Sequence, residues 1–353
     1  MLGFSIYLNN DITSATEQYI NRLKQNGFDG IFTSVHIPEE DSKKYQQRLF
    51  SLGNLAKNNN LNVMVDIDQV SLKKLDISLS SLDSLKRRGI TGLRIDDKLV
   101  PKQIAELSQK IEIGINGSTF TEEELKQLGT FNAEMKNIQV WFNFYPCPDT
   151  GISRQFFRKQ TQIFKQYGLQ VQAFFAGDEN LRGPLHEGLP TLEYQRNYDP
   201  LASILELKEL GADLLYLGDL GISDKALDQI KNYQETDSII LYTKQAENIS
   251  EEMYNYILGK HNQRPDPAEH VVRCEDSRMH AVPMITPENT ILREVGSITL
   301  NNCLYERYAG EIQLVKDALT MNKKVNVVGK VTNGSLPLID LIKPSQKFYL
   351  FRE

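Results

Sequence analysis

The chain of 353 residues has few of the side chains from which metal and disulfide sites are built. Its three cysteines, Cys147, Cys274 and Cys303, have no paired spacing, which predicts reduced thiols in a cytoplasmic protein. The motifs HExxH, CxxC and GxSxG are absent, and so is a phosphate-binding P-loop. Cys274 and His280 alone are weak evidence for zinc. We therefore expect neither a metal nor a cofactor, and chemistry that depends on carboxylates.

The chain also lacks a net positive charge and long apolar runs. The formal net charge is −6 and the pI is about 5.6, which argues against a general binder of nucleic acid or of anionic membranes. No apolar run approaches the ~20 residues of a membrane span. The first residues show neither the basic nor the apolar part of a signal peptide. We expect a cytoplasmic protein with no membrane insertion, and its overall charge still allows a local basic pocket for phosphate.

What the chain does have, up to about residue 236, is a regular alternation of strand-like and helix-like segments. Short runs rich in β-branched and aromatic residues lie at 3–8, 30–35, 62–67, 92–95, 111–115, 138–144, 171–175 and 213–218. Strands that alternate with helices imply right-handed crossovers and a parallel sheet. Eight such units in roughly 230 residues predict a (β/α)8 TIM-type barrel over residues 1–236. An open doubly wound sheet is the alternative, but no GxGxxG follows the first strand.

The helical segments have recognisable ends. Thr121 and Glu124 form a predicted capping box, and Gly129 is expected to close the same helix. Gly168 is expected to close the helix that starts near residue 154. Further N-caps are predicted at Ser153, Asp199 and Ser250.

After residue 236 the pattern changes. One helix is expected at 250–260, followed by β-like runs at 270–274, 297–302, 324–331 and 348–351 without helices between them. Short strands separated by turn residues are typical of a small β-rich domain. The sequence therefore predicts a second domain over residues 237–353, whose edges are also compatible with a homodimer contact.

Polar residues follow nearly every predicted strand of the first domain. In a TIM barrel the ligand-binding groups lie at the C-terminal ends of the strands. Each of these residues alone has a structural explanation, such as capping the next helix. Because so many strand ends carry such groups, we expect them to form one acidic bowl for a hydroxylated ligand. The residues are Asp66, Asp96, Asn116, Asn143, Tyr145, Asp178 and Asp219.

The connection after the seventh predicted strand, GDENLRGPLHEGLPTLEYQR at 177–196, is long, charged and rich in turn residues. Its glycines and prolines allow sharp, stiff turns. A solvated surface loop has little use for the leucines that this segment also carries. We therefore expect the loop to fold over the barrel mouth, with Arg182 and Glu187 near the ligand.

Several long motifs carry a family resemblance. They are GFSIYL (3–8), GFDGIFTSVHIPEED (27–41), LRID (93–96), NGSTF (116–120), NFYPCPDTGIS (143–153), AGDENLRGPLHEGLPTLEYQR (176–196) and VVRCEDSRMH (271–280). Because these motifs occur in this order, the chain resembles a family of bacterial proteins once labelled "outer surface protein". The family is now represented by the 6-phospho-N-acetylmuramidase of Gram-positive cell-wall recycling. One departure is Cys147, where the family pattern leads us to expect a basic residue.

The resemblance implies a TIM-type barrel followed by a cyclophilin-like β-barrel. It also implies cleavage of the β-1,4 bond of N-acetylmuramic acid 6-phosphate–N-acetylglucosamine, after a phosphotransferase-system transporter has imported and phosphorylated the disaccharide. A phosphorylated substrate belongs in the cytoplasm, in agreement with the absent signal peptide.

Glycoside cleavage needs a proton for the leaving oxygen and a negative group to stabilise the oxocarbenium-like centre. Asp96 and Asp178, on opposite sides of the predicted barrel mouth, are candidates for this pair of carboxylates. Glu187 is an alternative acid and Asp66 an alternative base. The 2-acetamido group of the sugar is a further candidate nucleophile. The sequence does not choose among these routes, nor between retention and inversion.

The substrate's phosphate and lactyl carboxylate need cationic partners. Arg182 in the loop, and Arg273 and Arg278 in the second domain, are candidates because guanidinium groups bind such anions at two points. An ion pair with Glu275 or Asp276 is the alternative role for the last two arginines. The start of the helix after the eighth strand is another candidate phosphate site.

Two other classes of protein remain open at this point. An aldolase or epimerase on the same barrel would need a Schiff-base lysine or a metal cluster, and no lysine falls within the eight predicted strand cores. A non-catalytic sugar-phosphate sensor or adhesin would bind the ligand and release no product.

Overall fold

The structure is a computed structural model that describes residues 1–35, 42–75, 82–95, 99–277 and 284–353. The chain divides into two compact units, Met1–Ser223 and Asp224–Glu353. Helix α9 (Asp224–Thr236) groups with the second unit, whereas the sequence assigned it to the barrel. Among the described helices, none has the length and the apolar content needed to cross a membrane.

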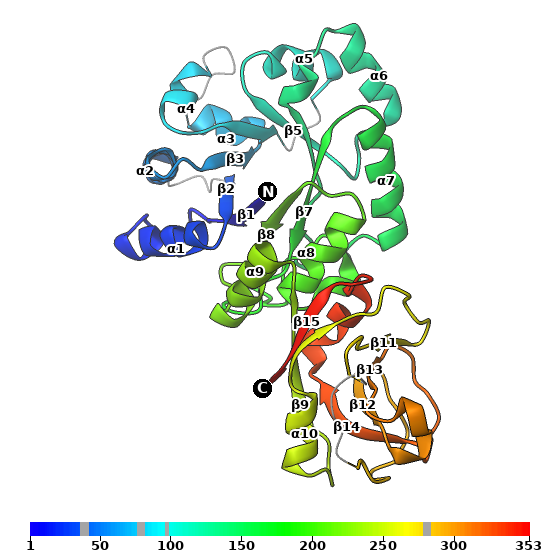
Figure 1. Cartoon of the computed structure of the whole chain (residues 1–353). Coiled ribbons are helices and arrows are strands. Elements are labelled where there is room, and N and C mark those ends of the chain that lie inside the picture. The colour runs from blue at the N-terminus through cyan, green and yellow to red at the C-terminus, as the bar shows by residue number, and fades with distance from the viewer. Residues whose placement is uncertain (36–41, 76–81, 96–98, 278–283) are drawn as a thin grey trace. The chain divides into compact units, whose positions relative to one another are not determined.

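The first unit is a closed barrel of eight parallel strands in the order β1 to β8 (Figure 1). The strands are β1 (Leu2–Ser5), β2 (Phe28–Val35), β3 (Asn62–Ile67), β4 (Gly92–Ile95), β5 (Glu112–Asn116), β6 (Ile138–Trp141), β7 (Gln170–Phe175) and β8 (Leu214–Leu217). The helices between them are α1 (Ser14–Gln25), α2 (Ser42–Asn58), α3 (Gln69–Lys74), α4 (Asp83–Arg87), α5 (Pro101–Ser108), α6 (Glu122–Thr130), α7 (Arg154–Gln166) and α8 (Pro200–Glu209). Short 3₁₀ turns lie at η1 (Met135–Asn137) and η2 (Glu193–Gln195). The predicted TIM-type barrel is confirmed.

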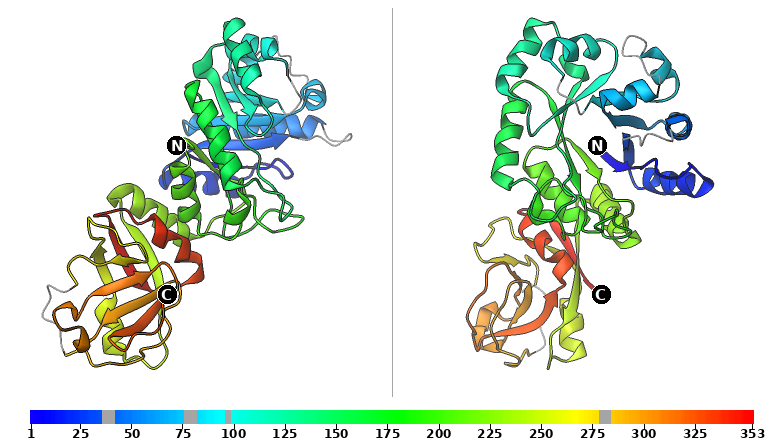
Figure 2. Two further views of the ribbon diagram at one scale, coloured as in Figure 1. Left: turned by 90° about the vertical axis from the view of Figure 1, so that its right-hand side faces the viewer. Right: turned by 180° about the vertical axis from the view of Figure 1, so that it is seen from behind.

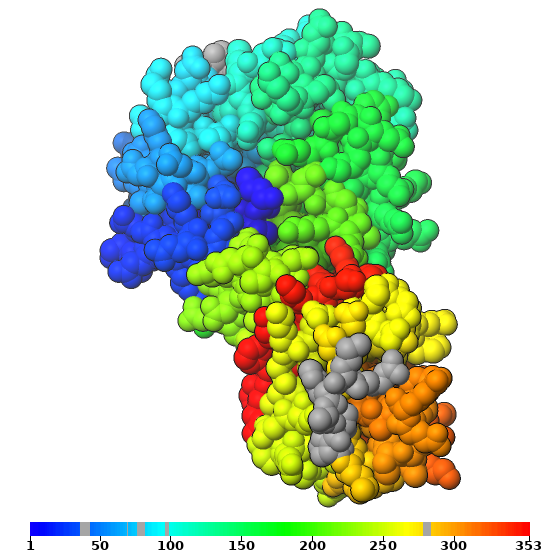
Figure 3. Space-filling view, in the orientation of Figure 1, coloured from blue at the N-terminus to red at the C-terminus, as the bar shows by residue number. Residues whose placement is uncertain are grey.

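Large aromatic side chains fill the interior of the barrel. Alternate residues of each strand point inward, and in small barrels their side chains occupy the whole interior. Trp141 is fully buried, with its ring 5.6 Å from that of Phe32 and 4.8 Å from that of Tyr216. At Gly3 and Gly30 an added Cβ would come within 2.3 and 2.2 Å of Tyr216 atoms, so these strands need glycine to accommodate the ring. The space-filling view shows side chains closing the spaces between the ribbons (Figure 3).

The predicted helix ends are largely confirmed. Thr121 and Glu124 form the capping box of α6, and Gly168 follows α7 with a φ of +73°. The prediction for Gly129 was wrong: this glycine lies inside α6, which continues to Thr130 and has Phe131 as its C-cap. The side chains of Ser153, Asp199 and Ser250 accept hydrogen bonds from the first turns of their helices, as predicted.

The second unit is built on a seven-stranded sheet in the order β10-β15-β9-β14-β12-β13-β11, which curls into a half-barrel (Figure 2). Its strands are β9 (Ile239–Gln245), β10 (Gly259–Asn262), β11 (Val271–Arg273), β12 (Ser297–Asn301), β13 (Ile312–Val315), β14 (Val325–Val331) and β15 (Lys347–Arg352). Helix α10 (Glu251–Ile257) and the 3₁₀ segments η3 (Cys303–Tyr308) and η4 (Asn333–Leu341) complete it. The predicted β-rich second domain is confirmed. The sequence missed β9, β10 and β13, and the helix expected at 250–260 stops at Ile257 because β10 begins at Gly259.

Candidate active site

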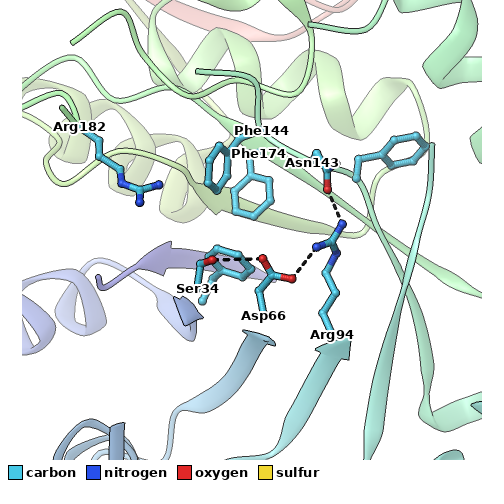
Figure 4. Close-up of a pocket in the computed structure, with 9 residues that line it drawn as sticks. Ser34, Asp66, Arg94, Asn143, Phe144, Phe174 and Arg182 are labelled. Atoms are coloured by element: carbon cyan, nitrogen blue, oxygen red, sulfur yellow. Dashed lines mark hydrogen bonds and ion pairs between the residues drawn. The ribbon is translucent and has the colours of Figure 1, made fainter. Parts of the chain in front are cut away.

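A cavity of about 230 Å³ lies at the carboxyl ends of the barrel strands (Figure 4). Strands β2, β3, β4 and β7 line it, together with the segment after β6 and the loop after β7. The lining residues are Phe32, Ser34, Asp66, Arg94, Phe142, Asn143, Phe144, Phe174 and Arg182. Parallel strands place their carboxyl ends at one end of a barrel, which is why residues so distant in the sequence meet here.

Four polar side chains form one connected network, which we call the mouth network: Ser34, Asp66, Arg94 and Asn143. The sheet register pairs Ser34 with Asp66 and Asp66 with Arg94, so the three residues are neighbours across β2, β3 and β4. Ser34 Oγ donates to Asp66 Oδ2 at 3.2 Å, and Arg94 Nη1 donates to Asp66 Oδ1 at 2.5 Å. Arg94 Nη2 donates to Asn143 Oδ1. Figure 4 shows this chain of contacts along one side of the cavity.

The ion pair in this network is buried. Asp66 is 7% exposed and Arg94 is 4% exposed. A buried charge is costly unless it is paired and hydrogen-bonded, and here each partner meets both requirements. A carboxylate has about four acceptor positions, of which the described contacts of Asp66 use two. The carboxylate can therefore accept a further hydrogen bond from a ligand in the cavity.

Aromatic rings form another wall of the cavity. The Phe174 ring lies 5.0 Å from that of Phe32 and 5.1 Å from that of Phe144, both edge to face. Aromatic faces carry partial negative charge, and the C–H bonds of a sugar ring carry partial positive charge. A cavity with an aromatic wall beside a polar network matches the apolar face and the hydroxyl groups of a sugar.

Arg182 brings a second guanidinium group to the cavity, from the long loop at residues 177–196. Its Cζ lies 3.7 Å from the centroid of the Tyr7 ring and 5.7 Å from that of Phe144. In Figure 4 it is separated from Arg94 by Phe144 and Phe174. The cavity thus has cationic groups in two places, one paired with Asp66 and one stacked on aromatic rings.

Asp219 fixes the path of the long loop. It is fully buried and accepts hydrogen bonds from the backbone N–H groups of Gly177 at 2.9 Å, Arg182 at 3.0 Å and Leu189 at 2.9 Å. Burial raises the pKa of the Asp219 carboxyl, while these three hydrogen bonds and the charge of Arg182 oppose that rise. Asp219 therefore joins both halves of the loop to the end of β8.

Glu193 and Arg196 form a second fixed point, which we call the loop clasp. Arg196 Nη2 donates to Glu193 Oε2 at 2.6 Å and Nε donates to Oε1 at 2.7 Å. The hydrogen bonds from Arg196, together with those from two backbone N–H groups, lower the pKa of Glu193 to about 2. Backbone groups take up the remaining contacts: Asp149 N and Gly151 N donate to Glu193, and the carbonyls of Tyr145, Cys147 and Gly188 accept from Arg196.

Three of the predicted site residues, Asp66, Asn143 and Arg182, line the cavity. Asp178 and Glu187 do not line it. Asp178 is exposed and accepts from Ser223 N at 2.8 Å and Ser223 Oγ at 2.5 Å, next to the start of α9. Glu187 is exposed on the long loop. No observation tests their catalytic roles, which stay predictions.

The other predicted residues lie elsewhere. Asn116 lines a separate cavity of about 310 Å³ beside α5 and α6, and its Oδ1 accepts from Ser118 N. Tyr145 contacts Ser118 Oγ at 3.3 Å. In the second unit, Arg273 forms an ion pair with Asp266 at 2.9 Å, rather than with the acidic residues expected from sequence. Asp96 and Arg278 lie outside the described residues.

Sequence reasoning missed Arg94. The residue stands in a strand of four residues, GLRI, all of which are buried. A charged residue inside so short a buried strand is itself unusual, because buried charges need partners. The motif LRID, which was quoted for the family resemblance, contains this arginine, but only its aspartate was proposed as a site residue. Among the described residues, no group of three or more His, Cys, Asp or Glu side chains is placed to hold a metal ion.

The fold and the cavity define a (β/α)8 barrel protein with a polar, aromatic ligand site at the carboxyl ends of its strands. The chain belongs to the 6-phospho-N-acetylmuramidase family: the model of the family's N-terminal part matches residues 2–232, and that of its C-terminal part matches residues 239–351. The family's name indicates a glycosidase. A search of the curated proteins found no match to the chain.

Two solved structures are similar over nearly their full lengths. One is a conserved protein of unknown function from a locus in Enterococcus faecalis, with 39% identity and a TM-score of 0.91, covering 100% of this chain and 96% of that one. The other is an uncharacterized B. cereus protein, with 23% identity and a TM-score of 0.76, covering 99% and 98%. At that lower identity the second likeness concerns the fold alone.

Proposed function

We propose that the protein is a glycoside hydrolase that cleaves the β-1,4 bond of N-acetylmuramic acid 6-phosphate–N-acetylglucosamine during peptidoglycan recycling. The observation that carries this proposal is the mouth network beside an aromatic wall, in a chain that two models of the 6-phospho-N-acetylmuramidase family match. The network offers a fixed negative charge, and the wall offers a surface for a sugar ring.

In this proposal Asp66 supplies the negative group that glycoside cleavage requires. Its carboxylate stabilises the positive charge that develops at the anomeric carbon, and Arg94 holds the carboxylate in place. Because the carboxylate is already oriented by Ser34 and Arg94, little reorganisation is needed during the reaction. The proton for the leaving oxygen comes from a second carboxylic acid, for which Asp96 and Glu187 are the candidates.

The anionic groups of the substrate suit the cationic side of the cavity. Guanidinium groups bind phosphate and carboxylate at two points, and Arg182 lines the cavity. The family resemblance implies that a phosphotransferase-system transporter phosphorylates the disaccharide as it imports it. We therefore propose a cytoplasmic enzyme that acts downstream of a phosphotransferase-system transporter. A homodimer contact through the second unit remains part of the proposal.

The test is to incubate the protein with the phosphorylated disaccharide and with its unphosphorylated form, and to determine the masses of the products by mass spectrometry. A hydrolase releases two sugars whose masses sum to the substrate plus one water, and the phosphorylated substrate reacts much faster. An aldolase or epimerase gives products without added water. Binding with no product would contradict the proposed hydrolysis.

A further inference from the structure

Arg182 is held by its backbone as well as by its side chain. Its N–H donates to Asp219 Oδ1 at 3.0 Å, while Asp219 Oδ2 accepts from Gly177 N and Leu189 N, both at 2.9 Å. These three donors lie on both sides of the turn that carries Arg182. The carboxylate is fully buried, so water does not compete for its hydrogen bonds. One side chain at the end of β8 thus sets the position of the Arg182 backbone.

The Tyr7 ring supports the other end of the same residue. The Arg182 guanidinium carbon lies 3.7 Å from the ring centroid, well within the range of a cation–π contact. Tyr7 is itself fixed, because its hydroxyl donates to the carbonyl of Gly218 at 2.6 Å. Gly218 directly precedes Asp219 in the sequence. The two supports of Arg182 therefore both depend on the segment that follows β8.

The two arginines of the cavity differ in whether a carboxylate lies beside the guanidinium group. Arg94 forms an ion pair with Asp66 at 2.5 Å. Within the part of the chain that the structure describes, no carboxylate lies within 4.0 Å of the Arg182 guanidinium. Burial raises the pKa of Tyr7 to about 12, so the phenol beneath the guanidinium is neutral at physiological pH. The cavity thus contains a fixed cation that a ligand anion can neutralise.

We propose that Asp219 is a positioning residue, which holds Arg182 through its backbone so that the guanidinium, stacked on Tyr7, receives an anionic group of the sugar ligand. The inference rests on the proposed function for the identity of that ligand. Phosphate and carboxylate share the chemistry that the guanidinium recognises, namely two oxygen acceptors with negative charge. The proposed substrate carries both groups, and the experiment separates them.

The first measurement is binding to the intact protein by calorimetry, which needs no turnover. The probes are N-acetylglucosamine 6-phosphate, with phosphate alone; N-acetylmuramic acid, with carboxylate alone; and N-acetylglucosamine, with neither. We expect Arg182→Ala to raise the Kd of one anionic probe about tenfold or more and to leave that of the neutral sugar unchanged. The probe that responds identifies the anion. An equal change for all three probes, or no change for any, overturns the anion role.

The second measurement is a double-mutant cycle between Asp219→Asn and Arg182→Ala. Asparagine keeps the size of the side chain but loses acceptor capacity, so at least one of the three loop hydrogen bonds is weakened. We expect Asp219→Asn alone to raise the Kd of the responding probe about threefold to tenfold, and to change nothing further in the Arg182→Ala background. A merely structural role for Asp219 would weaken the neutral sugar equally and would add to the effect of Arg182→Ala. That additive outcome overturns the positioning role.

A matched pair at Tyr7 keeps the inference testable if Asp219→Asn fails to fold. Tyr7→Phe retains the ring under the guanidinium, and Tyr7→Leu removes it while preserving an apolar side chain. We expect Tyr7→Leu to raise the Kd of the responding probe about threefold and Tyr7→Phe to raise it less. Equal effects of the two substitutions contradict the stacked support. Because all these readouts are binding constants, an Arg182-dependent Kd without hydrolysis would refute only the proposed reaction, and hydrolysis without that dependence would refute only this inference.

Discussion

Two arginine–carboxylate pairs at the barrel mouth have the same chemistry and different surroundings. Asp66 and Arg94 meet at 2.5 Å, and Glu193 and Arg196 meet at 2.6 Å. The first pair also contacts the side chains of Ser34 and Asn143, and it lines a cavity. The second pair also forms hydrogen bonds with backbone N–H and C=O groups of two loops. A pair that is saturated by backbone holds the chain in place, whereas a pair with acceptor capacity left over can meet a ligand.

The largest expected effect comes from breaking the first pair. Asp66→Asn removes the negative charge that faces the cavity and keeps the size of the side chain. We expect kcat for the phosphorylated disaccharide to fall about 10²- to 10³-fold, the range for loss of one preorganised group that stabilises transition-state charge, while circular dichroism still shows a folded protein. The matched control is Asp213→Asn, which breaks an ion pair with Lys165 at the start of β8, the opposite end of the barrel. A similar loss of kcat in both variants would contradict a catalytic role for Asp66.

A smaller loss of kcat is expected when Arg94 is replaced by lysine, which keeps the positive charge but not the planar guanidinium group. Arg94→Lys places a compact ammonium group where a planar fork bonds both Asp66 and Asn143. A misplaced carboxylate costs about 10²-fold in rate, and we expect kcat to fall by that amount. Steady-state kinetics at saturating substrate measures the effect. Full activity in this variant would show that the network needs only the charge of Arg94.

Breaking the second pair should lower the stability of the fold and leave kcat nearly unchanged. Glu193→Gln removes the charge that holds Arg196 and weakens the bonds to Asp149 N and Gly151 N. We expect the free energy of unfolding to fall by about 1–3 kcal/mol, measured by urea denaturation. The value of kcat should stay within about threefold of the wild type, because Glu193 does not line the cavity. A large fall in kcat with unchanged stability would remove the distinction between the two pairs.

The smallest effect is a dependence on pH. The folded-state pKa of Glu193 is lowered from 4.5 to about 2, chiefly by the hydrogen bonds from Arg196. The clasp therefore contributes stability above pH 4.5 and loses that contribution as the pH falls toward 2. We expect the difference in melting temperature between the wild type and Glu193→Gln to shrink over this interval. A difference that stays constant with pH would show that the ionisation of Glu193 does not stabilise the fold.

Most of the fold was predictable because it depends on local patterns. The eight strand runs of the barrel follow from β-branched and aromatic composition, and the caps at Thr121 and Ser153 follow from side chains that satisfy the first N–H groups of a helix. Gly129 was misread because a glycine ends a helix only where the backbone turns, and the turn comes two residues later at Phe131. Strand β13 was missed because its run of four residues, IQLV, is short and is interrupted by the polar Gln313.

The site was predictable only in part. Asp66 and Asn143 were found because the carboxyl ends of parallel strands converge. The direction in which Asp178 turns was not predictable, since its partner Ser223 lies 45 residues away. Glu187 is exposed because Asp219 and the loop clasp set the course of the loop that carries it. In each case the sequence gives the residue's position in an element, and distant contacts set where its side chain points.

By itself the sequence determined the alternation of strands and helices, the helix caps and the set of polar residues at the strand ends, because these depend on neighbours a few positions apart. Only the tertiary structure decided that Asp66 is paired with Arg94 while Glu193 is paired with Arg196, and that the first pair lines the cavity at the barrel mouth. The register between neighbouring barrel strands brings Ser34, Asp66 and Arg94 side by side. That register is fixed when the barrel closes around its aromatic interior, which is a property of the whole sheet and of no single segment.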